Sequence, residues 1–186
     1  SRVSRGLGDV YKRQTHGLIK EEKLKFDKSQ NDDMVLTYHD SCNVARASRM
    51  GDKAGGQFEI PRNIIKAVCN NYHDMSKDTI KEGTYCCGGG GGLLTDDLME
   101  LRVKGALPRM EALRRVVEDH GVTHMAAICA ICKSQFSKVF PYYDFTMDQI
   151  VSVHQLVSNA IILTGQHDEN DENDGENHPQ QDIDEA

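Results

Sequence analysis

Tryptophan is absent from this 186-residue chain, and aromatic residues make up only 6% of it. So few rings argue against a stacking platform for single-stranded nucleic acid, and a net charge of −7 further disfavours a nucleic-acid partner. The chain also lacks the run of roughly 18 to 20 apolar residues that a membrane-spanning helix requires. With 38% apolar residues it can bury one core of medium size, and a second full domain is not expected.

Both ends of the chain have unusual compositions. Residues 166–186 hold nine acidic residues and no basic one, so we expect a disordered, solvated tail. At the other end, Ser4 to Gln14 reads SRGLGDVYKRQ, which back-translates in one reading frame to a sequencing-library adapter. We therefore expect residues 1–14 to be a translation artefact and residues 15–33 to be a linker. The chain from Thr15 onward is then expected to be the C-terminal fragment of a longer protein.

Removing residues 1–14 tests the artefact interpretation. Because a foreign segment makes no native contacts, the deletion should leave the thermal unfolding temperature unchanged within error. A large loss of stability in the thermal melt would show instead that the segment packs as native structure.

The remaining sequence alternates between strand-like and helix-like patterns. Four short apolar runs predict buried strands over 34–39, 83–86, 122–128 and 150–154. Helical patterns lie between them, one with Pro61 in its first turn, one capped by Thr95, and one from Pro108 to Gly121; a last helix is expected over 155–163. Strands that alternate with helices favour parallel pairing. We therefore predict an α/β fold over 34–165, with a small, mostly parallel sheet of about four strands flanked by helices.

All six cysteines lie between residues 42 and 132. Five of them follow a predicted strand: Cys42, Cys86, Cys87, Cys129 and Cys132. Because the carboxyl ends of parallel strands meet at one edge of a sheet, we expect these five sulfurs to converge there. A helix expected to begin near Lys133 would also favour the thiolate form of the last two.

Three kinds of site compete for these sulfurs. A disulfide framework suits small secreted domains with little core, and adjacent Cys86 and Cys87 are poorly placed for one. A structural zinc site uses four thiolates and would leave one of the five unused. An iron–sulfur cluster accepts four or more cysteines and benefits from backbone N–H groups aimed at its sulfurs. The pattern therefore favours a cluster over the other two sites.

Gly88 to Gly92 form a run of five glycines directly after the cysteine pair. No Lys-Ser/Thr follows the run, so a phosphate loop for a nucleotide is not indicated. Without side chains, Gly88, Gly89 and Gly90 would let the backbone approach a bound cofactor closely, although a plain flexible turn has the same composition.

Three other residues near the cysteine motifs are candidates for a structural or functional role. Cys69 continues the apolar face of a predicted helix and is expected to be a core residue. His39, in the sequence His39-Asp40-Ser41-Cys42, is the histidine best placed to tune a cluster or relay protons, with a hydrogen-bonded structural histidine as the alternative. Arg46 is the cationic neighbour of this motif and a candidate to balance a negatively charged cluster.

The order Cys42, Cys86-Cys87-Gly88 and Cys129-Ala130-Ile131-Cys132 resembles the cysteine-rich CCG domain of the heterodisulfide reductase B/D family. The surrounding sequence, over about residues 33–163, is similar to the DsrK branch of this family, whose members belong to the membrane complex DsrMKJOP. The segments that carry the resemblance are YHDSCNVARASRMGD, EIPRNIIKAVCNNY, TYCCGGGGGLLTDDLMELRVKGALPRMEAL and THMAAICAICKSQFSKVFPYY.

This resemblance implies an oxidoreductase of dissimilatory sulfur metabolism. Its five cysteines would hold a noncubane [4Fe–4S] cluster at which a disulfide or trisulfide is reduced, the substrate being the sulfur-carrier protein DsrC. The other subunits of a DsrMKJOP-like complex would be its partners and would hold it in the cytoplasm, at the inner face of the membrane. Electrons would arrive from ferredoxin-type clusters in a missing N-terminal part. An iron–sulfur subunit of a glycolate or lactate oxidation system is one alternative, and a zinc-stabilised interaction module without redox activity is another.

Overall fold

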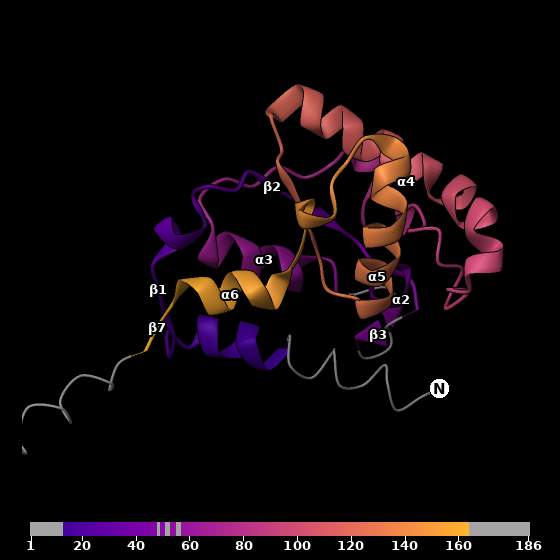
Figure 1. Cartoon of the computed structure of the whole chain (residues 1–186). Coiled ribbons are helices and arrows are strands. Elements are labelled where there is room, and N and C mark those ends of the chain that lie inside the picture. Colours follow the sequence, from indigo (N-terminus) through magenta and orange to yellow (C-terminus); the bar gives the residue numbers. More distant parts are fainter. Residues whose placement is uncertain (1–12, 48, 51–52, 55–56, 164–186) are drawn as a thin grey trace, which may run out of the picture.

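The structure is a computed structural model that describes residues 13–47, 49–50, 53–54 and 57–163 (Figure 1). The acidic tail and residues 1–12 of the expected artefact lie outside these ranges, and residues 13–20 are helical. None of the helices in the described part of the chain is both long and apolar enough to cross a membrane.

Helices and short strands alternate along most of the described residues. The strands are β1 (Lys25–Phe26), β2 (Leu36–His39), β3 (Arg49–Met50), β4 (Lys53–Ala54), β5 (His124–Ala127), β6 (Ile150–Ser152) and β7 (Ile161–Ile162). The α-helices after residues 13–20 are α2 (Cys42–Ala45), α3 (Glu59–Val68), α4 (Met99–His120), α5 (Ala130–Val139) and α6 (Val153–Ala160). The 3-10 helices are η1 (Lys28–Asn31), η2 (Lys77–Thr79), η3 (Lys81–Gly83), η4 (Asp96–Leu98), η5 (Phe140–Tyr143) and η6 (Met147–Gln149).

A three-stranded parallel sheet in the order β2-β5-β6 forms the centre of the fold. β2 pairs with β5 from Leu36 opposite His124 to His39 opposite Ala127, and β5 pairs with β6 from Met125 onward. Two short antiparallel pairs, β1 with β7 and β3 with β4, lie outside this sheet. The predicted α/β class with a small parallel sheet flanked by helices is confirmed.

The fourth predicted strand, over 83–86, is wrong. η3 ends at Gly83, and the chain from there to the glycine run is irregular. One physical reason is that the outer edge of β2 is already occupied, because Leu36 exchanges backbone hydrogen bonds with Asn71 and His73. The Thr84 hydroxyl instead donates to the backbone carbonyl of Asp40, just past the end of β2, at 2.7 Å. The segment is therefore tied to the end of the sheet and adds no strand to it.

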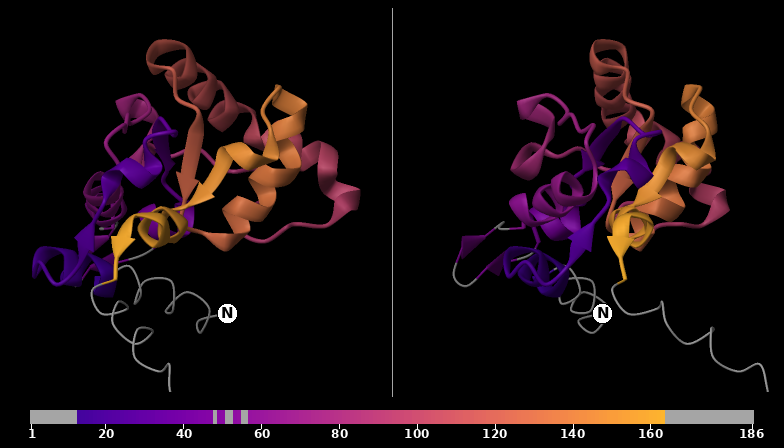
Figure 2. Two further views of the ribbon diagram at one scale, coloured as in Figure 1. Left: turned by 60° about the vertical axis from the view of Figure 1, so that its left-hand side comes forward. Right: turned by 90° about the vertical axis from the view of Figure 1, so that its left-hand side faces the viewer.

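Two helical layers cover the two faces of the sheet (Figure 2). α3 and α6 pack on one face, over a core that includes Leu36, Tyr38 and Ala126. α4 and α5 pack on the other, over a second core that includes Met125. Because successive side chains of a strand point to opposite faces, neighbours on β5 enter different cores. All of β2 is buried, as is typical of a parallel sheet covered on both sides.

α4 is longer than the pattern from Pro108 to Gly121 predicts. Thr95 precedes η4 in an extended conformation without making the expected capping hydrogen bond, and α4 then runs through Pro108 without a break. Since proline has no N–H, the carbonyl of Lys104 loses its helical partner at this exposed position. Gly121 ends the helix in the left-handed region, with φ of 66°, as predicted.

A buried ion pair fixes the chain immediately after β2. Arg62 on α3 binds both carboxylate oxygens of Asp40, at 2.9 and 2.6 Å, and also binds Asp74. The same Asp40 carboxylate accepts a hydrogen bond from the backbone N–H of Lys81 at 2.9 Å. The end of β2 and the segment around Lys81 are thus anchored to one buried carboxylate.

Candidate functional site

The carboxyl ends of β2 and β5 bring two of the five candidate cysteines to one edge of the sheet. Cys42 begins α2 just after the end of β2, and Cys129 directly precedes α5, just after the end of β5. These strands are parallel neighbours, with His39 opposite Ala127 at their carboxyl ends. The structure therefore places both cysteines at the edge that the sequence predicted for them.

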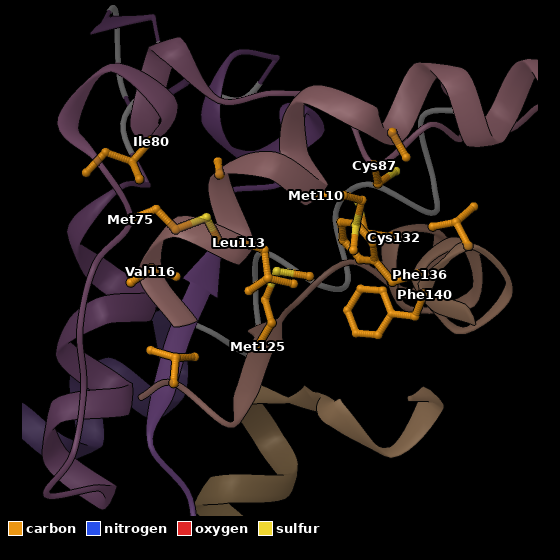
Figure 3. Close-up of a cluster of buried hydrophobic side chains, with 14 residues drawn as sticks. Met75, Ile80, Cys87, Met110, Leu113, Val116, Met125, Cys132, Phe136 and Phe140 are labelled. Atoms are coloured by element: carbon orange, nitrogen blue, oxygen red, sulfur yellow. The ribbon is translucent and has the colours of Figure 1, made fainter. Parts of the chain in front are cut away.

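Cys86 and Cys87 reach the same region without a strand. In the core beneath α4, Cys87 lies beside Met110 and Cys132 (Figure 3). Hydrogen bonds join the sulfur of Cys86 to that of Cys87, the sulfur of Cys87 to that of Cys132, and the sulfur of Cys132 to that of Cys129. Four thiol groups from two distant segments thus form one continuous chain of contacts, which we call the thiol chain.

Along the thiol chain, cysteines with a raised pKa alternate with cysteines whose pKa is lowered and which therefore favour the thiolate form. Hydrogen bonds from Cys132 and Cys86 hold the pKa of Cys87 well below its usual value. The pKa of Cys132 is raised, because its proton is shared with Cys129 and Cys87 and because it is buried. Hydrogen bonding to Cys87 and burial likewise raise the pKa of Cys86. Two thiolates, at Cys87 and Cys129, are therefore stabilised by two neighbouring thiols.

The start of α5 supplies a second source of thiolate stabilisation. The helix begins at Ala130, earlier than the predicted start near Lys133, so Cys129 occupies the N-cap. Hydrogen bonds from the Cys132 thiol, from the backbone N–H groups of Cys132 and Ile131, and from the Ser41 hydroxyl lower the pKa of Cys129 to about 5. A thiol at the positive end of a helix is a ready anionic ligand.

The glycine run closes the other side of the thiol chain. The backbone N–H of Gly88 points at the Cys86 sulfur, at 3.3 Å, and those of Gly89 and Gly90 also stabilise the cysteine pair. Gly88 has φ of 88°, and a Cβ there would lie 2.2 Å from the backbone oxygen of Arg102 on α4. A residue without a side chain is required at this point, because the turn packs directly on the helix.

Cys42 and Cys69 occupy different surroundings from the thiol chain. Cys42 is partly exposed, and its neighbour Ser41 bridges toward the chain, since the Cys132 sulfur lies 3.6 Å from the Ser41 hydroxyl oxygen. Cys69 ends α3 and is buried in the core on the opposite face of the sheet, where burial raises its pKa to about 12. The prediction that Cys69 is a core residue is confirmed.

Among the buried basic side chains near the thiol chain, His39 was expected from the sequence and Arg109 was not. His39 is buried against Phe136, with ring centroids 4.8 Å apart, and neither ring nitrogen has a hydrogen-bond partner among the described residues. Arg109 on α4 is also fully buried, and it was missed because a lone Arg on a helical pattern gives no sequence signal. Arg46, the cation that the sequence suggested, is exposed at the end of α2.

A groove opens beside Cys86 at the surface. Its walls combine Cys86 and the glycine turn with the first turns of α4, and its volume is about 190 Å³. Leu93 and Leu101 line it with 51% and 60% of their surfaces exposed, and Leu98 lines it as well. Cys86 is thus the member of the thiol chain that lines this groove, whereas Cys87 and Cys132 are buried.

The donor set fits an iron–sulfur cluster by its chemistry. Four soft sulfur donors follow one another along the thiol chain, backbone N–H groups point at three of them, and a glycine turn leaves room beside them. Within the described ranges, no three His, Cys, Asp or Glu side chains are arranged to hold a single metal ion.

The buried state of His39 predicts a dependence of stability on pH. Burial, together with the positive charge of Arg109, lowers the pKa of His39 to about 3, against 6.5 for an ordinary histidine. The unfolded chain therefore binds a proton that the folded chain excludes, so this stabilisation is complete above pH 6.5 and is lost as the pH falls toward 3. Between pH 7.5 and 5.5 the free energy of unfolding should drop by about 1.4 kcal/mol.

Urea unfolding of the full chain and of His39→Gln at these two pH values measures this contribution. The substitution should remove the drop, whatever its effect on stability at pH 7.5. His124→Gln, at the partly exposed start of β5, is the matched control and should retain it. An unchanged drop in His39→Gln would contradict the assignment.

Relatives of this chain are found among heterodisulfide-reductase-like (Hdr-like) proteins. Over 147 residues, 79% of the chain, it is 43% identical to the Hdr-like menaquinol oxidoreductase iron-sulfur subunit 2 of Archaeoglobus fulgidus and 46% identical to the Hdr-like menaquinol oxidoreductase iron-sulfur subunit of Archaeoglobus profundus. Over 122 residues, 62% of the chain, it is 32% identical to a subunit of the dihydromethanophenazine:CoB–CoM heterodisulfide reductase of Methanosarcina acetivorans.

Each of these alignments spans 25% of the length of the relative. The chain therefore matches about a quarter of each of these relatives. No protein-family profile and no solved structure matches it.

Proposed function

This chain is homologous to a segment of the iron–sulfur subunits of the Hdr family, and we propose that it holds an iron–sulfur cluster and passes electrons through it. The observation that carries the proposal is the thiol chain, in which residues 86–87 and 129–132 bring four sulfurs together with backbone N–H groups aimed at them. Such a set of thiolates and amides is what an iron–sulfur cluster requires of a protein.

The proposed cluster is of the noncubane [4Fe–4S] type. Its proposed ligands are Cys42, Cys86, Cys87, Cys129 and Cys132, with Gly88, Gly89 and Gly90 enclosing it. The reaction is the reduction of a disulfide or trisulfide: for a disulfide, the S–S bond takes up two electrons and two protons and breaks to give two thiols. When bound, the cluster would supply the electrons one at a time, while the protein supplies geometry and electrostatics.

The residues of the chain have separable tasks in this proposal. Cys87 and Cys129 are already held as thiolates, so little free energy is needed to deprotonate them for metal binding. The N–H of Gly88 orients the Cys86 sulfur. Cys86 also lines the groove, so a substrate sulfur can approach there, and the exposed leucines on its walls would displace water from that sulfur.

We further propose partners and a cellular location for this chain. The resemblance to DsrK supports a place in a DsrMKJOP-like membrane complex, with the sulfur-carrier protein DsrC as the disulfide or trisulfide substrate. In that setting the chain would lie in the cytoplasm, at the inner face of the membrane, and would be held there by its partner subunits. Electrons would come from a quinol-oxidising partner through further iron–sulfur clusters.

Anaerobic purification of the full chain tests the proposed function. We expect several irons and acid-labile sulfides per chain, broad absorbance into the visible range, and an EPR signal in at least one oxidation state. A colourless chain that carries one zinc and gives no paramagnetic signal would overturn the proposal in favour of a zinc-stabilised interaction module.

A further inference from the structure

Three arginines are among the largest fully buried side chains of this structure, and they differ in how their charge is balanced. Arg62 is paired with Asp40 at 2.6 Å and with Asp74 at 2.9 Å. Arg102 lies 3.5 Å from Asp96 and also binds the side-chain oxygen of Gln135. Burying a guanidinium without an anion costs several kcal/mol, so such pairing is the normal arrangement.

Arg109 is the exception. Among the described residues no carboxylate forms an ion pair with it, and its Nε has no hydrogen-bond partner. Its other nitrogens donate to uncharged groups, namely the Met75 sulfur, the Thr79 carbonyl and, at 2.9 Å, the Thr84 hydroxyl. Asp40 is the charged group that stabilises the Arg109 cation most, but it makes no ion pair with Arg109, and both of its oxygens are already bound by Arg62.

The surroundings of Arg109 lead directly to the thiol chain. Its guanidinium holds Thr84 and lies 5.8 Å from the ring centroid of Tyr85, and these two residues immediately precede the cysteine pair. Met110, the next residue on α4, packs in the same core as Cys87 and Cys132 (Figure 3). The charge of Arg109 interacts with both of these sulfurs, and burial lowers its pKa only to about 10, so it stays charged at neutral pH.

We propose that Arg109 supplies the positive charge that balances the Cys87 thiolate and, resting on the proposed function, that it sets the reduction potential of a cluster held by Cys87 and Cys132. An adjacent buried cation stabilises the more negative, reduced state of a redox centre, and it does so strongly where no water screens the charge. Arg109 is thus a positioning residue that acts through the cluster ligands, and it takes the role that the sequence had suggested for Arg46.

The midpoint potential of the cluster in the full chain tests this role. Arg109→Gln removes the charge, so the reduction equilibrium should shift at least tenfold toward the oxidised form, which is 59 mV for a one-electron couple. Arg109→Met is a second neutral variant, whose apolar side chain fills part of the same core space. It should give the same shift, and it replaces the glutamine variant in the test if that variant does not fold. Arg109→Lys keeps the charge, and its shift should be less than half as large in millivolts.

Arg114→Gln is the matched control, because Arg114 lies on the same helix with 51% of its side chain exposed. Its potential should equal that of the unmodified chain. A potential that stays constant in both neutral variants, with iron content retained, would overturn the role of Arg109 while leaving the proposed function intact. An unmodified chain without iron would instead overturn the proposed function itself.

Discussion

Replacing Cys87 or Cys132 by Ser is expected to remove most of the iron from the anaerobically purified chain. These two residues are buried at 4% and 3% exposure, and each contacts two other cysteine sulfurs. Serine offers a harder oxygen ligand with a much higher pKa, which is a poor substitute for thiolate at iron. Loss of a direct ligand should exceed the roughly 10 to 100-fold fall in metal affinity that is typical when a supporting residue outside the ligand shell is lost.

Cys42→Ser, Cys86→Ser and Cys129→Ser complete the series. If all five cysteines are ligands, each single change should lower the iron content or alter the EPR signal. Cys42 is the most informative of them. It lies at the same edge of the sheet as Cys129, but it is its neighbour Ser41 that contacts Cys132. Cys69→Ser is the control, because Cys69 lies in the core on the other face of the sheet.

The pattern of losses separates the possible sites. A four-ligand zinc site would leave one of the five cysteines dispensable and would give no paramagnetic signal. If Cys87→Ser kept full iron occupancy, an unchanged spectrum and unchanged disulfide reduction in the intact parent complex, the five-ligand assignment would fail at that position.

The placement of Cys42 and Cys129 at one edge of the sheet was predictable from the sequence, because the carboxyl ends of parallel strands lie at the same edge. Each follows a short apolar run, and the runs pair as the parallel strands β2 and β5. Cys86 and Cys87 reach the same place for a reason that local pattern does not contain. Their segment is fixed by tertiary contacts, chiefly the bond from Thr84 to Asp40 and the packing of Gly88 on α4.

The sequence also did not predict which cation lies next to the thiol chain. Arg46 stands close to Cys42 along the chain, whereas Arg109 is far from every cysteine in the sequence and becomes relevant only through the packing of α4. A helical pattern that places an Arg beside Met110 indicates a solvent-facing side chain, because charged residues are rarely buried. A buried guanidinium without a carboxylate is therefore recognised from the structure alone.

Gly88→Ala is expected to destabilise the fold by roughly 3 to 5 kcal/mol. The new Cβ would lie 2.2 Å from the backbone oxygen of Arg102 and 3.1 Å from the Cβ of Ala106, and both belong to the rigid helix α4. In addition, φ at this position is 88°, a conformation that costs a residue with a side chain about 1 to 3 kcal/mol. The turn has to move away from α4, and the Cys86 sulfur loses the N–H that orients it.

Gly105→Ala is the matched control, since Gly105 faces Gly88 across the same contact. A Cβ there would meet the Cα of Gly88 at 3.6 Å, which is an ordinary van der Waals distance, and alanine favours a helix interior over glycine by roughly 0.5 to 1 kcal/mol. The two substitutions add one methyl group each to one contact and should change stability in opposite directions. Anaerobic thermal melts should show the unfolding temperature falling by roughly 10 °C for Gly88→Ala and holding or rising for Gly105→Ala. Equal melting temperatures for the two variants would mean that the glycine turn does not pack on α4, and the enclosure of the thiol chain by the glycines would then have to be abandoned.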